Sequence, residues 1–326
     1  MGKADLAAQF DYRYSRGTKM KNFSKYAWFV LLFNLFIIIW GAFVRASGSG
    51  AGCGDHWPKC NGEIIPMDPS IETIIEFTHR ATSGLALIFV VILFFWARRL
   101  ASPRVLFYAR NSLIFIIIEA LLGAGLVLLG LVDKNETYSR ALVMSIHLVN
   151  TFFLIAAILL TAYTASFASQ GHFLTEWKSK KTAGLLQFAA VLAMVLLGVS
   201  GAVTALGDTL YPATTWEDGL AKTEISTVGY VLLRLRILHP LLALTAGAFI
   251  AVFPLLLLKR MAMPRVKLLS ISVIALVAIQ IVCGYINIIL MAPVYMQLIH
   301  LALADLLWLS LVALIAAQNE PVAQHA

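Results

Sequence analysis

Four histidines lie at matched positions in the two halves of this 326-residue chain, each within an apolar run: His79, His147, His239 and His300. A histidine inside hydrocarbon is costly and usually binds something. For any one of them alone, a hydrogen bond between helices is an equal explanation. Neutral imidazole is a good ligand for haem iron, and helical bundles build cofactor sites from side chains on facing helices. The paired arrangement therefore favours two haem sites, and it disfavours zinc, which needs more ligands than two histidines.

These histidines belong to an internal repeat. Each half carries a Gly-Ala pair, a histidine, a later glycine and a second histidine, in the order Gly41, His79, Gly123, His147 and then Gly201, His239, Gly284, His300. The first interval is 38 residues in both halves, and the second is 44 and 45 residues. The third shrinks from 24 to 16 residues, because the connection near Asp133 has no equal in the second half. This order and spacing indicate a duplication.

The composition indicates a membrane protein. Hydrophobic residues make up 60% of the chain and charged residues 13%, which is wrong for a soluble enzyme of this length. A spanning helix needs about 20 mostly apolar residues. Eight such stretches are predicted, at 27–47, 75–97, 107–131, 141–165, 183–205, 236–258, 266–290 and 294–317. Open sheets cannot satisfy their backbone in lipid. The predicted fold is therefore an all-α polytopic membrane protein with eight transmembrane helices in two pseudo-symmetric four-helix bundles.

The net charge of +8 is spread over connections rather than gathered into a nucleic-acid-binding patch. Basic residues cluster before the first apolar stretch and in every second connection, whereas the other connections hold most of the acids. Because positively charged loops stay in the cytoplasm, both termini are predicted to be cytoplasmic and the four histidines to lie toward the outer face. The first stretch is predicted to be a retained helix, since no cleavage pattern follows it. We expect contact with the lipid bilayer and no nucleic-acid partner.

Five segments follow from these assignments. They are a cytoplasmic N-terminal segment (1–26), an N-terminal four-helix bundle (27–165), a cytoplasmic linker (166–182), a C-terminal four-helix bundle (183–317) and a cytoplasmic tail (318–326). Both halves enter from the same side, so the repeats are parallel. The sequence leaves the oligomeric state open, a homo-oligomer included.

The two halves differ beside their first histidines. Glu76 lies three residues before His79 and thus on the same helix face, whereas Arg236 stands at that place before His239. Only the first half has a carboxylate there. We infer that the first half reacts and that the second half holds a resident redox group.

Two further acidic residues lie within apolar runs. Glu119 is matched in the second half by neutral Gln280. A structural hydrogen bond and a functional role explain Glu119 equally well, so its role stays open. Asp305 is consistent with a buried polar link between helices and is assigned no other role.

Several arginines lie at the outer ends of predicted helices. Arg45, Arg80, Arg234 and Arg236 are candidates for pairing with haem propionates, because guanidinium matches carboxylate geometry. Interfacial snorkelling explains each of them at least as well. An ion pair with Arg80 or Arg45 is likewise the structural alternative to a functional role for Glu76.

Two cysteines close together lie in the first outer connection. Cys53 and Cys60 flank Gly-Asp-His-Trp-Pro-Lys, and outside the cytoplasm such a pair favours a disulfide. The disulfide is either a structural staple or a redox-active group that exchanges electrons with the nearby haem site. A zinc site formed with His56 is a third alternative and is incomplete. Cys283 lies within a predicted helix and is most simply explained as a small packing residue.

The motifs together resemble one family. Gly41-Ala-Phe-Val-Arg45, the Ser47-Gly-Ser-Gly stretch, Gly52-Cys53-Gly-Asp-His-Trp57-Pro58-Lys-Cys60 and Glu76-Phe-Thr-His79-Arg80 are similar to those of bacterial haem A synthases that carry a cysteine pair. The later histidines fall where that family has its other three. The resemblance covers essentially all eight predicted helices.

The resemblance implies an activity. Members of the family oxidise a methyl group of haem O to a formyl group by successive hydroxylation and loss of water, which gives haem A for terminal oxidases. Carried over, His79 and His147 would bind the substrate haem O, and His239 and His300 would ligate a resident haem b. Glu76 would be the essential carboxylate, and Cys53–Cys60 a loop disulfide tied to activity.

The resemblance also implies a setting and partners. The protein would lie in the bacterial cell (inner) membrane, would receive haem O from a haem O synthase and would pass electrons to an acceptor that the sequence does not identify. Some relatives carry a second cysteine pair in the second outer connection, and residues 206–235 have none here. A transmembrane di-haem b-type electron carrier without substrate chemistry is the main alternative, and it has no need for Glu76 in one half only. A transporter is a third class, disfavoured by the lack of a strongly polar pathway.

Overall fold

A computed structural model of the protein describes residues 3–100, 102–169, 181–215, 217–218, 227–260 and 263–319. Within these ranges, eight long helices account for nearly all of the chain: α1 (Lys3–Ala46), α2 (Ile71–Arg98), α3 (Pro103–Leu128), α4 (Tyr138–Ser169), α5 (Lys181–Leu210), α7 (Thr227–Arg260), α8 (Pro264–Ile289) and α9 (Val294–Gln318). Each contains a segment long and apolar enough to cross a membrane. The prediction of an all-α polytopic membrane protein is confirmed.

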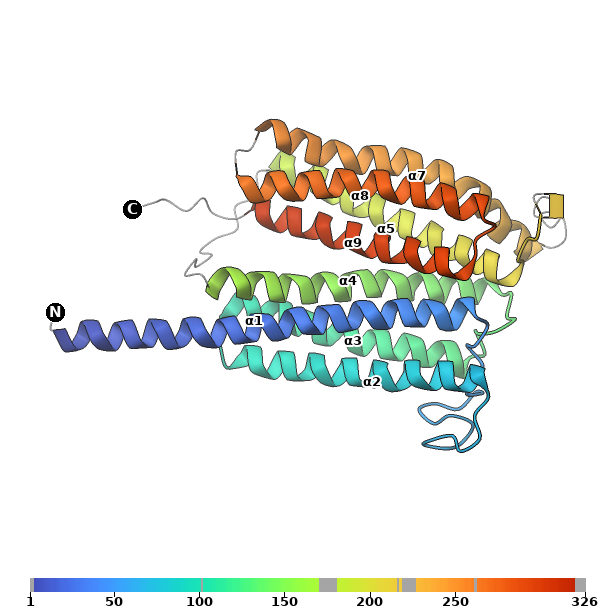
Figure 1. Ribbon diagram of the computed structural model, residues 1–326, viewed down its shortest axis with the longest axis horizontal. Coiled ribbons are helices and arrows are strands. Elements are labelled where there is room, and N and C mark those ends of the chain that lie inside the picture. The colour runs from blue at the N-terminus through green and yellow to red at the C-terminus, as the bar shows by residue number, and fades with distance from the viewer. Residues whose placement is uncertain are drawn as a thin grey trace.

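The helices form two groups of four. Figure 1 shows α1 to α4 in one half of the molecule and α5, α7, α8 and α9 in the other. Along the seam between them, α4 packs against α5 and α9, and α1 also reaches α9. At this seam the buried Trp308 ring stacks on the Phe152 ring (5.2 Å between centroids), and its indole N–H donates to the Phe152 carbonyl oxygen (2.7 Å). The two bundles therefore share a packed, mostly apolar interface.

Local sequence sets where several helices begin or weaken. The Ser70 hydroxyl accepts a hydrogen bond from the Thr73 N–H (3.2 Å) and caps the start of α2. Pro103 and Pro264 stand in the first turn of α3 and α8, where the missing N–H has no helical partner anyway. Inside α7, Pro240 removes one backbone donor from the turn that carries His239. The ladder of helical hydrogen bonds is thus interrupted beside a candidate ligand.

Two helices extend beyond the apolar stretches predicted for them. α1 begins at Lys3, so most of the segment 1–26 forms the first part of a 44-residue helix. In Figure 1 its first turns project beyond the other helices. α7 begins at Thr227, ahead of the predicted stretch 236–258, and its membrane-long apolar part is Arg236–Lys259. An apolar run marks only the part of a helix that faces lipid, and helical hydrogen bonds continue past it. Residues 170–180 of the expected linker and 320–326 of the expected tail lie outside the described residues.

One end of the molecule carries the candidate chemistry. We call it the disulfide side and define it as the end where α1 finishes at Ala46 and α2 starts at Ile71. The connection between these helices, residues 47–70, hangs from this end in Figure 1. The helices that carry the four histidines, α2, α4, α7 and α9, all begin at this end. Each histidine lies in the first half of its helix, so all four lie nearer to this side.

Candidate functional site

Each of the four histidine rings lies against a glycine of the preceding long helix. A Cβ atom added at Gly41 would come within 2.8 Å of the His79 Cε1 atom, and one at Gly123 within 3.7 Å of the His147 Nε2 atom. The corresponding distances are 3.1 Å from Gly201 to the His239 Cε1 atom and 3.0 Å from Gly284 to the His300 Cε1 atom. Three of these distances are tighter than ordinary van der Waals contact. The glycines of the repeat therefore provide the space that the imidazoles occupy.

Two of the rings are held through their Nδ1 atoms. The His239 Nδ1 atom lies 2.8 Å from the Ser200 hydroxyl in a hydrogen bond. The His147 Nδ1 atom lies 2.7 Å from the Glu119 Oε1 atom. A metal-binding histidine usually engages its second nitrogen with a hydroxyl, carboxylate or carbonyl, which fixes the ring orientation. Both contacts leave Nε2 as the nitrogen available to a metal.

Glu119 is tied to helix α4 at three points. Its carboxylate accepts hydrogen bonds from the Asn150 amide and the Thr151 hydroxyl, in addition to the contact with His147. The structure thus places Glu119 behind His147 as an orienting group. In the second half, the Gln280 amide nitrogen donates to the His300 carbonyl oxygen (3.0 Å) and lies 3.3 Å from the His300 Nε2 atom. The matched residues therefore support their histidines in different ways.

The donor atoms fit two haem groups. His79 and His147 lie in the first bundle, on α2 and α4, and His239 and His300 in the second, on α7 and α9. The Nδ1 atoms of His79, His147 and His300 are buried and make no hydrogen bond of good geometry among the described residues, although the His147 Nδ1 atom lies 2.7 Å from the Glu119 Oε1 atom. Buried polar atoms are normally satisfied, so an unpartnered imidazole nitrogen favours a bound group. Each bundle thus offers two imidazoles of the type that ligates haem iron.

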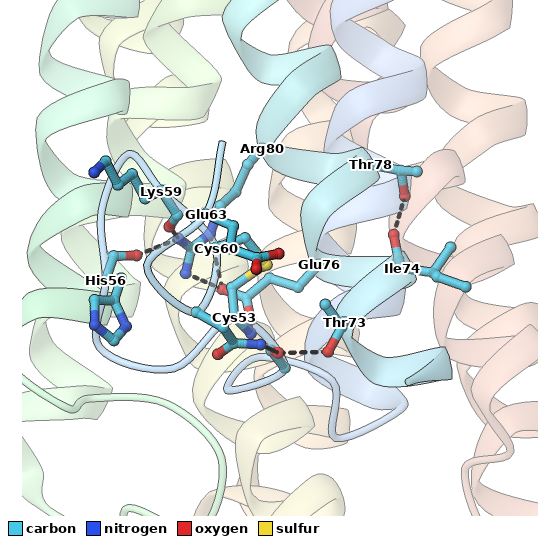
Figure 2. Close-up of a disulfide and its surroundings, with 12 residues drawn as sticks. Cys53, His56, Lys59, Cys60, Glu63, Thr73, Ile74, Glu76, Thr78 and Arg80 are labelled. Atoms are coloured by element: carbon cyan, nitrogen blue, oxygen red, sulfur yellow. Dashed lines mark hydrogen bonds and ion pairs between the residues drawn. A yellow bond between two sulfur atoms is a disulfide. The ribbon is translucent and has the colours of Figure 1, made fainter. Parts of the chain in front are cut away.

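Glu76 lies buried beneath the disulfide loop, which we define as residues 52–60. Its Oε2 atom accepts a hydrogen bond from the Cys53 N–H (2.8 Å), and its Oε1 atom accepts from the Arg80 guanidinium (Nε–Oε1 3.0 Å). The Arg80 guanidinium also donates to the carbonyl oxygens of His56 and Lys59 (Figure 2). The pairing with Arg80, considered from the sequence as an alternative, is therefore present. It fixes the carboxylate one helical turn from His79.

The disulfide between Cys53 and Cys60 is present, and both residues are buried. Backbone bonds brace it, since the Cys60 N–H donates to the Glu63 carbonyl oxygen (2.8 Å) and the Asn61 N–H to the Cys53 carbonyl oxygen (2.9 Å). Both sulfur atoms are joined in the disulfide, so neither can bind zinc together with His56 in this oxidised loop. The disulfide is adjacent to Glu76, because the Cys53 N–H donates a hydrogen bond to that carboxylate.

Three of the four arginines named from the sequence, Arg45, Arg80 and Arg236, have protein partners in this structure, and the side chain of Arg234 lies outside the described part of the chain. Arg80 binds Glu76 and the disulfide loop, as described above. The Arg236 Nε atom lies 2.7 Å from the Asp208 Oδ1 atom, and its Nη2 atom donates to the Tyr211 carbonyl oxygen (3.0 Å). Arg45 crosses the seam. A role of these arginines toward haem propionates stays a prediction.

Arg45 joins the two bundles at the disulfide side. It extends from the last turn of α1 and donates to the Ala205 carbonyl oxygen (2.7 Å), the Thr209 hydroxyl (2.6 Å) and the Gln297 amide oxygen (3.2 Å). Its acceptors lie on α5 and α9. Gly41 and Gly201, which support His79 and His239, lie one turn before Arg45 and Ala205 on the respective helices. Arg45 therefore links the immediate surroundings of the two histidine pairs.

Removal of this link is expected to destabilise the protein. Hydrogen bonds to charged groups contribute roughly 1.5 to 3 kcal/mol each. In Arg45→Met the Ala205 carbonyl oxygen keeps its bond from the Thr209 hydroxyl (2.9 Å). We therefore expect a net loss of about 2 to 5 kcal/mol, less than three separate bonds would give. Unfolding in mixed detergent and SDS micelles measures the change. Arg99→Met, at an exposed arginine, is the matched control. If Arg45→Met unfolds at the same SDS fraction as the unmodified protein, the three bonds do not stabilise the seam.

Sequence reasoning missed two residues of the site. Ser200, which holds His239, directly precedes Gly201 in the repeat, but Trp40 stands at the matched position and gave no signal. Asp208 lies beyond the predicted apolar stretch 183–205, yet it stands in the last turns of α5, paired with Arg236. The helix runs on past the predicted end at residue 205, which brings Asp208 into the bundle.

The fold and the site define a class of protein: a polytopic helical membrane protein with two duplicated bundles, each holding a pair of intramembrane histidines suited to haem. Comparison with known families gives the particular assignment. The family described as "Cytochrome oxidase assembly protein" (COX15-CtaA) matches residues 24–312. The chain therefore belongs to this family, and the resemblance found in the sequence motifs is confirmed.

Relatives within the family carry two different names. A "Protoheme IX farnesyltransferase" of Thermus thermophilus is 45% identical over 298 residues, which is 90% of this chain and 48% of that protein. A "Heme A synthase" of Shouchella clausii is 43% identical over 115 residues, 35% of this chain and 36% of that protein, and one of Halalkalibacterium halodurans is 48% identical over 96 residues, 29% of this chain and 32% of that protein. The chain thus spans about half the length of the Thermus relative and about a third of the haem A synthases.

Proposed function

We propose that the protein is a haem A synthase, an oxidoreductase that converts a methyl group of haem O to a formyl group. The observation that supports it most directly is the asymmetry between the halves. Both bundles carry a histidine pair, but among the described residues only the first has a buried carboxylate, Glu76, one turn before its histidine on the same helix. The second has Arg236 at that place, paired with the half-buried Asp208 of α5. A protein that only carries electrons has no need for this difference. Family membership and the haem A synthase relatives support the same activity.

The two bundles take different roles in this proposal. His79 and His147 bind the substrate haem O, and His239 and His300 hold a resident haem b. The resident haem supplies one-electron redox chemistry when bound. Replacing two hydrogens of the methyl group by one oxygen is a four-electron oxidation. With water as the source of the oxygen, four electrons and four protons pass to an acceptor. Glu76 provides a fixed negative charge that can stabilise positive charge developing at the oxidised carbon, or accept a proton.

The geometry around Glu76 suits a positioned charge. The Cys53 N–H and the Arg80 guanidinium hold its two oxygens, and the disulfide keeps Cys53 in place. Preorganised groups act strongly in a site from which water is excluded, because they need no reorganisation during the reaction. In this proposal the disulfide loop therefore serves catalysis by fixing the carboxylate. Whether its two sulfurs also exchange electrons is a separate property.

The remaining sequence predictions complete the proposal. The protein lies in the bacterial inner membrane with both termini in the cytoplasm, and the five segments keep the boundaries given above except that α1 and α7 start earlier. A haem O synthase supplies the substrate. In support, more than half of the Thermus relative lies outside the matched region, and that protein carries the name of a protohaem farnesyltransferase. A region similar to this chain is thus joined there to a further segment of comparable length.

Haem identification tests the proposal. We would produce the protein together with a haem O synthase, purify it, and separate the extracted haems by chromatography with mass detection. Haem A should appear together with haem b, and cells carrying the haem O synthase alone should yield haem O without haem A. Recovery of haem b and unconverted haem O from well-folded protein would contradict the synthase assignment and support the electron carrier.

A further inference from the structure

The connection that carries the disulfide ends in an exposed apolar turn. Ile64 is 79% exposed, Ile65 65% and Met67 84%, and they stand in sequence around Pro66. Trp57, in the neighbouring disulfide loop, is also exposed. Large apolar side chains gathered at one loop tip are unusual on a surface that faces water. We call Ile64, Ile65 and Met67 the apolar tip.

The disulfide loop runs alongside α2 rather than above its end. The Thr73 hydroxyl donates to the Gly52 carbonyl oxygen (2.6 Å), Glu76 accepts from Cys53, and Arg80 donates to the carbonyls of His56 and Lys59. Thr73, Glu76 and Arg80 stand on successive turns of α2. At 1.5 Å per residue, Arg80 lies about 13 Å from the start of the helix at Ile71. The loop therefore folds back along the first turns of a membrane-spanning helix.

The same helix gives the depth of this loop in a bilayer. Arg98 and Arg99 are exposed and end α2 at the opposite side, which places them at the other bilayer surface. From Arg98 to Arg80 the helix rises about 27 Å, whereas the hydrocarbon core is about 30 Å thick. Arg80 and the loop carbonyls that it binds thus lie close to the boundary between hydrocarbon and headgroups.

The connection also lies to the side of the bundle. In Figure 1 residues 47–70 extend sideways past α2, on the side away from α5, α7, α8 and α9. The apolar tip follows the disulfide loop in the same connection, so the two lie at a similar side of the bundle, next to lipid. Two backbone donors of the turn are satisfied within it, the Met67 N–H by the Glu63 carboxylate (3.0 Å) and the Glu63 N–H by the Cys60 carbonyl oxygen (3.0 Å). Backbone donors near hydrocarbon need such partners.

We propose that the apolar tip inserts into the leaflet on the disulfide side and contacts lipid acyl chains. Ile64, Ile65 and Met67 enter the boundary region, with Trp57 at headgroup level, where aromatic side chains are favoured. The disulfide loop is then held from two sides, by Arg80 on the protein side and by lipid through the apolar tip. The partner of this surface is the bilayer itself. This inference is independent of the proposed activity.

Spin-label accessibility tests the insertion. Single cysteines replace Ile64, Ile65 or Met67 in a Cys283→Ala background, while the Cys53–Cys60 disulfide stays oxidised and does not take the label. Labelled protein, one copy per nanodisc of phosphatidylcholine and phosphatidylglycerol, is probed with oxygen, which concentrates in lipid, and with a water-soluble nickel chelate. Lys134→Cys is the matched control, because Lys134 is exposed in another connection on the same side. All four positions are exposed, so the label does not disturb packing.

The expected result is an oxygen-to-nickel accessibility ratio at least several-fold higher at the three apolar-tip positions than at Lys134→Cys. Equal ratios at the tip and at Lys134→Cys would show that the tip faces water and would overturn the proposal. Exclusion of both reagents from the tip would show a protein contact and would overturn it as well. A normal haem content in the labelled protein confirms that the fold is retained in each case.

Discussion

Glu76→Gln is expected to lower conversion of haem O by about 100-fold or more, the usual effect of removing a group that stabilises charge or moves a proton. Haem b content should stay unchanged, because His239 and His300 lie in the other bundle. Glutamine keeps the size of the side chain, and its oxygen can still accept a bond from the Cys53 N–H. The variant therefore removes the charge while it leaves the loop in place. Haem A yield from cells that also express a haem O synthase measures the effect.

Controls separate this effect from damage to the loop. Glu72→Gln removes an exposed carboxylate one turn earlier on α2 and should convert haem O normally. Thiol labelling of denatured Glu76→Gln protein reports whether Cys53 and Cys60 are still joined. Normal haem A yield from Glu76→Gln protein would remove Glu76 from the mechanism. A loss of yield together with free thiols would assign the effect to the loop.

The sequence predicted the eight spans and the paired histidines because both are periodic or repeated features. An apolar run of bilayer length permits no other structure in lipid. The repeat also includes Gly41, Gly123, Gly201 and Gly284, but the sequence alone gives no reason for these glycines. Their contact with the imidazoles supplies that reason, since at Gly41, Gly201 and Gly284 a larger side chain would press on the ring.

Apolar runs and repeats do not predict which residues meet between helices far apart in the sequence. Arg45 was considered for Glu76 or a propionate, but it binds three groups on α5 and α9. Nothing in the apolar periodicity says how the two bundles face each other, so these partners follow only from packing. The same holds for Asp208, whose partner Arg236 lies on another helix. The apolar stretches also do not show where a helix starts, because α1 continues into its polar first part without a breaking signal strong enough to stop it.

The four glycines allow a test that addresses each bundle separately. Gly201→Val and Gly284→Val should lower haem b content by on the order of 10-fold or more, the effect of misplacing a metal ligand or its support. A Cβ atom at these positions meets the ring of His239 or His300 at 3.1 or 3.0 Å, and the valine methyl groups reach further. Either the imidazole or the helix must shift. Absorption of the reduced haem in purified protein measures the loss.

The first bundle should respond in the opposite way. Gly41→Val and Gly123→Val are expected to keep haem b and to lower haem A yield, with the larger effect at Gly41, where the approach to the ring is 2.8 Å rather than 3.7 Å. Gly84→Val and Gly125→Val are matched controls, since both glycines are helical and a Cβ atom there meets nothing within 4 Å. A general intolerance of valine in these helices would affect all six variants alike. Only a site-specific contact between glycine and ligand produces two classes divided by bundle and graded by distance.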